Sequence, residues 1–263
     1  TVVEDLRKEV IRQGLLGLKF RGLAEDIFVF RTITHFRSNP SVNASSCHEN
    51  YTTLSEYDPS IIDNERFHRF RDFMVPFLVT RQILDGAGGI HKDPVSGWQY
   101  VISQRAFFIN KVSSNDTTGH NRGLVHFRLK VNDAPPGHMR LHLHCGDANM
   151  SPFGKFYAMW ATHLVLRAYE EAERKRWLYT PHPHYTFSDF HGLAADPTLK
   201  KKIRLMKGEE EIAFSATQIQ RLYAEFVARH LDDLSEEEQK MFDTWVRLID
   251  TLETDPMLLA REL

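Results

Sequence analysis

The residues best suited to chemistry lie where cationic and imidazole side chains alternate with apolar ones. Between Met139 and Cys145 the polar positions are Arg140, His142 and His144. Successive side chains of a β-strand point to opposite faces, so this alternation would place those three on one face. Arginine binds phosphate and carboxylate groups bidentately, and histidine ligates metal ions. The pattern indicates an anion or metal site, although the solvated face of an antiparallel sheet would show the same alternation.

Two further segments carry a similar pattern. In residues 124–131 the polar positions include Arg128, and in residues 99–107 Ser103 and Arg105 fall on one side of the predicted strand. If the polar faces of these strands lined one concave surface, that surface would hold phosphates or carboxylates.

Each candidate also has a purely structural interpretation. Arg105 would pair with an acidic neighbour, Glu49 would brace a turn, and His144 would be an ordinary hydrogen-bonded histidine of the sheet. Cys145 is expected to be buried and inert. A zinc hydrolase built on His142 and His144 ranks last among the functional hypotheses, because no third ligand has convincing spacing.

The elements that must position these residues predict an α+β fold. Its central sheet is mainly antiparallel, helices flank the sheet, and the C-terminal third is helical. Apolar periodicity predicts helices over residues 1–25, 66–84, 152–174, 216–230 and 235–252. β-Branched and aromatic runs predict strands over residues 27–36, 99–107, 124–131 and 139–145. Ser151 and Ser235 are the predicted N-caps of the helices that follow them.

Composition narrows the function classes. The 263 residues are 42% hydrophobic and 26% charged, with a formal net charge of -2. A nucleic-acid-binding domain would be strongly basic, and no apolar run approaches the ~20 residues that cross a bilayer. We therefore expect neither nucleic acid nor a membrane as partner. The two cysteines cannot form a disulfide framework, which favours a reduced, cytoplasmic compartment.

Five short segments occur in an order that is typical of one protein family. They are residues 47–51 (CHENY), 80–88 (TRQILDGAG), 102–106 (ISQRA), 113–118 (SSNDTT) and 140–150 (RLHLHCGDANM). In these segments the chain resembles the Pup ligase and depupylase (Pup deamidase) family of the glutamine-synthetase-like carboxylate–amine ligase superfamily. The agreement in order and approximate spacing runs from about Phe28 to Glu170.

The resemblance implies a glutamine-synthetase-like fold whose sheet cradles ATP and Mg²⁺. It implies ATP-dependent ligation of the C-terminal glutamate of a small ubiquitin-like modifier to a target lysine, through an acyl phosphate. One alternative within the family is a deconjugase (isopeptidase) or deamidase. Another alternative is a non-catalytic module that binds the modifier. The sequence leaves these three open.

Carried onto this sequence, the resemblance assigns five site residues. His142 and Glu49 would contact the metal ion. Arg105 and Arg128 would be catalytic cations that also bind the nucleotide phosphates, and Asn50 would help to bind the nucleotide.

The resemblance also bears on domain organisation. Residues 1–263 are expected to form a portion of one glutamine-synthetase-like catalytic domain, without its N-terminal strand and without its C-terminal extension. In the family that strand carries metal-binding glutamates. An N-terminal fragment or a second subunit is therefore expected to complete the site.

Overall fold

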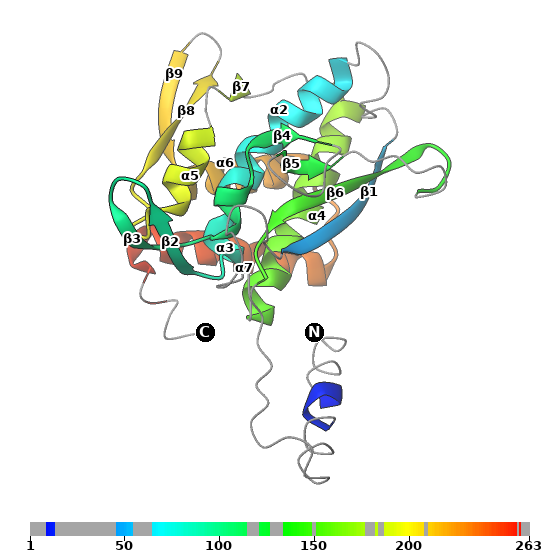
Figure 1. The fold of residues 1–263 in the computed structure, drawn as a ribbon. Coiled ribbons are helices and arrows are strands. Elements are labelled where there is room, and N and C mark those ends of the chain that lie inside the picture. Colours follow the sequence, from blue (N-terminus) through cyan, green and yellow to red (C-terminus); the bar gives the residue numbers. More distant parts are fainter. Residues whose placement is uncertain are drawn as a thin grey trace.

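The computed structural model of the chain describes residues 9–13, 46–54, 65–114, 121–126, 134–148, 151–176, 182–183, 187–207, 210–256 and 258. Within these residues, strands and helices mix along the chain, which confirms the predicted α+β class (Figure 1). The strands are β1 (Cys47–Leu54), β2 (Gly89–Asp93), β3 (Gly97–Val101), β4 (Lys111–Ser113), β5 (Gly123–His126), β6 (His138–Gly146), β7 (His182–Pro183), β8 (Lys202–Lys207) and β9 (Glu210–Ser215). The helices are α2 (Glu65–Thr80), α3 (Gln82–Asp85), the 3₁₀ helix η2 (Arg105–Phe108), α4 (Pro152–Arg174), α5 (Phe187–Ala194), α6 (Ala216–His230) and α7 (Glu236–Thr254).

Strand β6 is an inner strand of the four-stranded sheet, whose order is β1-β6-β5-β4. It pairs antiparallel with β1 on one side and with β5 on the other, while β4 pairs parallel with β5. This arrangement confirms the mainly antiparallel sheet. His142 of β6 lies opposite Asn50 of β1 and opposite His126 of β5. Directly opposed residues share a face, so these three side chains form a row across the sheet.

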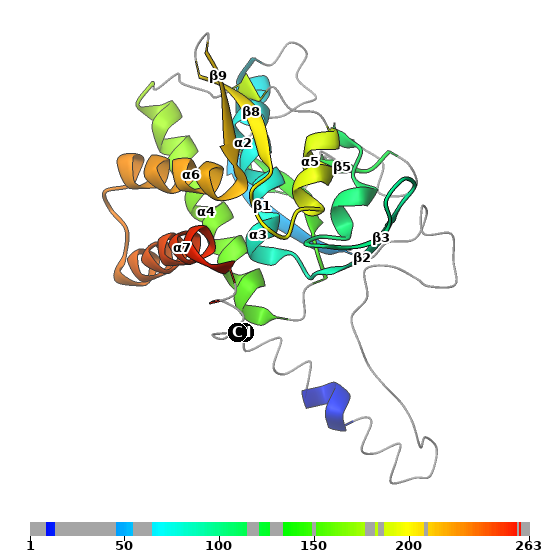
Figure 2. The ribbon, with the colours of Figure 1, turned by 90° about the vertical axis from the view of Figure 1, so that its left-hand side faces the viewer.

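The other face of the sheet packs into the core. Met139, Leu141 and Leu143 of β6 are almost fully buried, as their alternation predicted. Helix α4 contacts β1, and α2, α6 and α7 extend the same helical layer, which Figure 2 shows beside the strands. Aromatic rings fill the space between helices, with the centroids of Phe73 and Tyr223 5.1 Å apart. Burial of these large side chains supplies the main stabilisation of the layer.

Serine caps begin two helices where the sequence predicts them. The Ser151 side chain accepts a hydrogen bond from the backbone N–H of Gly154 at the start of α4. Ser235 and Glu238 form a reciprocal capping box at the start of α7. Helix α6 spans the predicted range 216–230. These starts are local features, so the sequence alone locates them well.

The strand predicted over residues 99–107 is wrong in its second half. Strand β3 ends at Val101 and pairs with β2 in a separate two-stranded sheet, and η2 begins at Arg105. The Asp147 carboxylate accepts hydrogen bonds from the Ser103 hydroxyl and from the backbone N–H of Arg105. These bonds hold the chain in a bend, so Ser103 and Arg105 do not share one face of a strand as predicted.

The C-terminal third is less helical than predicted, because β8 and β9 form a hairpin ahead of α6. The predicted helix over residues 66–84 is confirmed as α2 followed by α3. Residues 27–36 and 127–131 lie outside the described residues, as does most of the range 1–25, of which residues 9–13 are helical. No helix in the described ranges is both long and apolar enough to cross a membrane.

We expect the helical layer to be sensitive to loss of volume at its centre. Ile219 of α6 is fully buried, whereas Leu222 on the same helix is 41% exposed. Ile219→Ala should lower the free energy of unfolding by about 2–5 kcal/mol, because it removes buried methyl groups and leaves a cavity. Leu222→Ala is the matched control and should change it by no more than about 0.5 kcal/mol. Denaturant unfolding measures both, and equal losses would contradict the burial of Ile219 in the helical layer.

Candidate functional site

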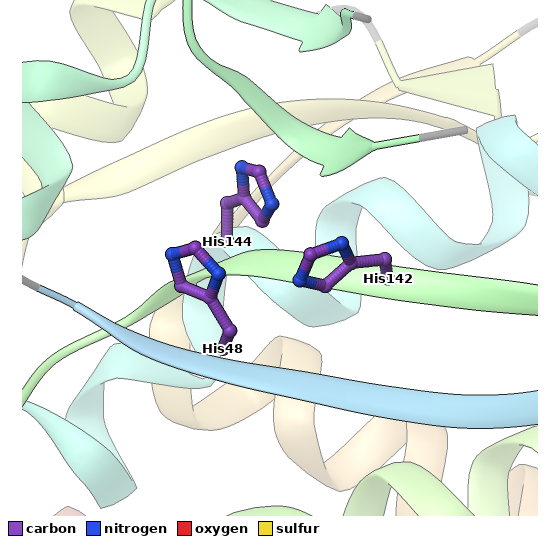
Figure 3. Close-up of side chains that lie close together, drawn as sticks. All are labelled: His48, His142 and His144. Atoms are coloured by element: carbon purple, nitrogen blue, oxygen red, sulfur yellow. The ribbon is translucent and has the colours of Figure 1, made fainter. Parts of the chain in front are cut away.

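Four histidines, from strands β1, β5 and β6, lie close together on the polar face of the four-stranded sheet. His48 comes from β1, and His142 and His144 come from β6 (Figure 3). Each of these three offers a ring nitrogen, and the three nitrogens lie within 4.8 Å of one another. The rings of His48 and His144 stack with centroids 4.3 Å apart, and His126 of β5 stacks on His144 at 5.0 Å. We call His48, His142 and His144 the three-histidine cluster.

The pairing of β1 with β6 brings His48 to this cluster, at a point where the ladder is irregular. The register shifts by one residue between the pairs Cys47–Gly146 and Glu49–Leu143. Such a shift is a β-bulge, and here the extra residue lies on β6, between Leu143 and Gly146. His48 shares the polar face with Asn50 by ordinary alternation, and its ring contacts both His142 and His144.

The surroundings keep the cluster uncharged near neutral pH. Burial, with the charge of Arg140, lowers the pKa of His142 to about 4. Burial, with the neighbouring His48, lowers the pKa of His144 to about 3. Burial, with the charge of Arg105, also lowers the pKa of His48. Neutral imidazole is the form in which histidine binds a metal ion.

Arg140 links the cluster to Asn50. Its Nε donates a hydrogen bond of 2.6 Å to Oδ1 of Asn50, and its guanidinium lies 3.1 Å from Nδ1 of His142. Asn50 therefore lies on the same face as His142. A guanidinium beside neutral imidazoles and an amide can bind an anion such as phosphate.

Arg105 contacts the cluster near the C-terminal end of β6. The side chain is buried, and its Nε donates to the backbone carbonyl of His144 at 2.9 Å. Asp147 fixes the backbone at Arg105. Its carboxylate accepts hydrogen bonds from the backbone N–H groups of Arg105 and Ala87 and from the Ser103 hydroxyl. Burial raises the pKa of Asp147 to about 7, although these three donors oppose the rise. One carboxylate thus joins three of the sequence segments that carry the family resemblance.

Glu49 is part of a buried ion pair. Both carboxylate oxygens accept hydrogen bonds of 2.8 Å from Arg81, and both side chains are 1% exposed. The ammonium group of Lys155 lies 3.2 Å from the same carboxylate, and the Tyr51 hydroxyl donates to it at 2.7 Å. Burial alone would raise the pKa of Glu49, but the charges of Arg81 and Lys155 outweigh burial and lower it.

The structure therefore separates the two predicted metal ligands, Glu49 and His142. Glu49 lies opposite Leu143, on the core face, whereas His142 lies opposite Asn50, on the polar face. Its contacts with Arg81 agree with the structural interpretation of Glu49 as a bracing group. The geometry brings together His142, Asn50 and Arg105, while Arg128 lies outside the described residues.

Sequence reasoning missed the third histidine of the cluster. His48 directly precedes Glu49 and Asn50, but no local pattern shows that β1 pairs with β6. His144 was predicted to be hydrogen-bonded, yet within the described part of the chain neither of its ring nitrogens has a partner. Cys145 is buried as predicted, and burial raises its pKa to about 11.

The donors on this face do not suit the Mg²⁺ ion that the resemblance implies. Magnesium prefers octahedral oxygen ligands such as carboxylates and phosphates. In the described strands of the sheet, the only acidic side chain is Glu49, and it faces the core. The donors beside His142 are imidazole nitrogens and one amide oxygen, Oδ1 of Asn50, which accepts a hydrogen bond from Arg140. This face of the described strands therefore lacks the carboxylates that would hold magnesium.

Two solved structures with a similar fold are of Pup ligases. The structure of the Pup ligase PafA of the prokaryotic ubiquitin-like modification pathway in complex with ADP superposes with a TM-score of 0.71 at 24% identity, over 95% of this chain and 52% of that one. The complex between the prokaryotic ubiquitin-like protein Pup and its ligase PafA gives a TM-score of 0.66 at 25% identity, over 91% of this chain and 46% of that one.

Sequence comparison identifies the family. Residues 21–263 match the family model described as "Pup-ligase protein", so the chain belongs to the Pup ligase family. It is 31% identical to a Pup–protein ligase of Saccharomonospora viridis, over 96% of this chain and 51% of the relative. It is 32% identical to a Pup–protein ligase of Geodermatophilus obscurus, over 100% of this chain and 55% of the relative. The chain spans about half the length of these curated relatives.

The buried ion pair predicts a large effect of one substitution. Glu49→Gln preserves size but removes the closer of the two carboxylates that Arg81 and Lys155 share, and leaves Asp85 as their one remaining countercharge among the described residues. The free energy of unfolding should fall by about 3–5 kcal/mol. Glu171→Gln is the control, because Glu171 pairs with Arg174 at the surface and should leave the unfolding midpoint nearly unchanged. A Glu49→Gln protein as stable as the wild type would contradict the structural role.

The same carboxylate gives the stability a pH dependence. The folded state lowers the pKa of Glu49, so its contribution is complete above the ordinary glutamate pKa of about 4.3 and is lost as the pH falls below that value. Denaturant unfolding at stepped pH should therefore show a steeper acid loss for the wild type than for Glu49→Gln. Parallel curves for the two proteins would show that the pKa of Glu49 does not change on folding.

Proposed function

We propose that this chain acts in the ATP-dependent ligation of a ubiquitin-like modifier, Pup, to lysines of target proteins. In the first step, the terminal phosphoryl group of ATP would move to the C-terminal glutamate carboxylate of the modifier, giving an acyl phosphate and ADP. In the second step, the lysine amine would attack the acyl carbon and release phosphate, forming the isopeptide bond.

The main observation behind the proposal is that, in a chain of the Pup ligase family, the polar face of strands β1, β6 and β5 presents groups that can bind an anion. Arg140, Asn50 and the three-histidine cluster present donors on that face, and Arg105 is fixed at its edge. Such a surface suits a phosphate or an acyl phosphate. Support for the reaction comes from the relatives, which are called Pup–protein ligases. Support for the ligands comes from the similar structures, which are complexes with ADP and with Pup.

Within this proposal the residues have separate tasks. Arg105 and Arg128 would bind the phosphates and offset the charge that develops during transfer. Asn50 would orient the nucleotide. His142 would contact the phosphates from the row that it forms with Asn50.

Magnesium and a completing partner remain part of the proposal. Magnesium would enter bound to phosphate oxygens of ATP, and carboxylates from a second polypeptide or an N-terminal fragment would complete its coordination. The lack of acidic side chains on the polar face of the described strands motivates this partner. Mass spectrometry of the purified protein should identify a copurifying polypeptide, and turnover by the purified chain alone would exclude the requirement.

The reaction is tested with purified protein, ATP, magnesium, a lysine-bearing target and Pup ending in either glutamate or glutamine. We expect an ATP-dependent conjugate on a gel with the glutamate form alone. Release of Pup from a preformed conjugate, without ligation, would indicate the deconjugase instead. Conversion of the glutamine form to glutamate would indicate the deamidase, and binding of Pup without turnover would indicate a binding module.

Arg128 provides a separate test of nucleotide binding. Arg128→Ala should weaken ATP binding about tenfold or more, because a charge-assisted hydrogen bond to phosphate is worth about 1.5–3 kcal/mol. Arg229→Ala, an exposed change on α6, is the control and should leave the affinity unchanged. Calorimetry gives both affinities, and equal values for Arg128→Ala and the wild type would remove Arg128 from the site.

A further inference from the structure

The three-histidine cluster has the donor set and the spacing of a metal site of its own. One ring nitrogen from each of His48, His142 and His144 lies within 4.8 Å of the others, and Figure 3 shows the rings converging over the β1–β6 ladder. The residues come from two paired strands, so the backbone that carries them is fixed by the ladder.

The cluster contains buried polar atoms that lack partners among the described residues. His144 is fully buried, and neither of its ring nitrogens makes a hydrogen bond there. Nε2 of His142 is likewise buried without a partner. Buried polar groups are nearly always satisfied in folded proteins. A metal ion held between the rings would bind one nitrogen of each ring.

The chemistry of the donors selects the ion. Imidazole suits zinc, copper, iron and nickel, whereas magnesium and calcium take oxygen ligands. We propose that His48, His142 and His144 bind a divalent transition-metal ion, for which Zn²⁺ is the probe. Zinc–nitrogen bonds of about 2.0–2.1 Å place two tetrahedral ligands about 3.3 Å apart. Small side-chain rotations would therefore close the cluster around the ion.

The surroundings determine what completes the coordination. Three protein ligands leave the fourth tetrahedral position open, as in catalytic zinc sites. His48 is exposed, so this position can be reached from solvent. The guanidinium groups of Arg105 and Arg140 lie near the cluster. They would oppose a bare cation and favour an anionic fourth ligand such as phosphate.

Arg140 competes with the ion for His142. The Arg140 guanidinium can donate to Nδ1 of His142 only while that nitrogen is unprotonated. An ion bound at Nδ1 would displace Arg140. An ion bound at Nε2 would require the proton to reside on Nδ1, where it would repel the same donor. In either case metal binding breaks the contact between Arg140 and His142.

The test is a titration of metal-stripped protein with Zn²⁺, Co²⁺ and Mg²⁺, without nucleotide or Pup. Zinc is measured by competition with a chromophoric chelator, and cobalt by the visible absorption of tetrahedral coordination. We expect one zinc ion per chain, a tetrahedral cobalt spectrum and no competition from magnesium. Adding phosphate should tighten zinc binding and perturb the cobalt spectrum.

Variants assign the ligands. His48→Gln and His144→Gln should each weaken zinc binding roughly tenfold or more, since even outer partners of a metal site cost 10–100-fold. His138→Gln, at the exposed start of the same strand, is the control and should bind as the wild type does. Arg140→Gln should bind zinc more tightly, because it removes both a competing donor and a positive charge. Unaltered affinity in His142→Gln would remove His142 from the ligand set.

The outcome that overturns the proposal is zinc affinity unaltered in both His48→Gln and His144→Gln, or magnesium competing equally with zinc. Circular dichroism shows whether each variant folds, and if the buried His144 variant does not, the exposed His48 variant decides alone. This inference does not depend on the proposed ligase function. Ligation without zinc binding would refute only the metal site, and zinc binding without ligation would refute only the ligase.

Discussion

The charge pair between Glu49 and Arg81 joins the two layers of this fold. Glu49 stands on β1, Arg81 lies between α2 and α3, and the hydroxyl of Thr162 on α4 accepts a further hydrogen bond from Arg81 at 2.6 Å. Two charges removed from water are tolerated only when each is fully paired. Here the bidentate geometry and the nearby Lys155 and Asp85 provide that pairing. The position of β1 relative to the helices follows from this network.

The position of β1 also determines which side chains lie on the polar face of the sheet. Glu49 must face the core, so its neighbours His48 and Asn50 are turned to the polar face, where His48 contacts the histidines of β6. Gly146 keeps the arrangement possible, because a β-carbon there would come within 2.8 Å of Oε1 of Glu49 and 2.6 Å of Nζ of Lys155. The ion pair on one face and the imidazoles on the other thus depend on the same strand pairing.

The polar face combines two kinds of recognition. Arginines near it favour phosphates, whereas uncharged imidazoles favour a transition-metal ion. The two are compatible if an anion bridges the ion and the guanidinium groups. Arg140 lies where they meet, since it contacts both Asn50 and His142.

The sequence by itself determined the features that depend on neighbouring residues. Alternation located β6 and its two faces, capping residues located the starts of α4 and α7, and short segments located the family. It could not determine the bend at Arg105, which depends on Asp147 more than forty residues away. Nor could it place Glu49 on the core face or add His48 to the histidines of β6. Those outcomes follow from strand register and from a buried ion pair, and both join residues that are distant along the chain.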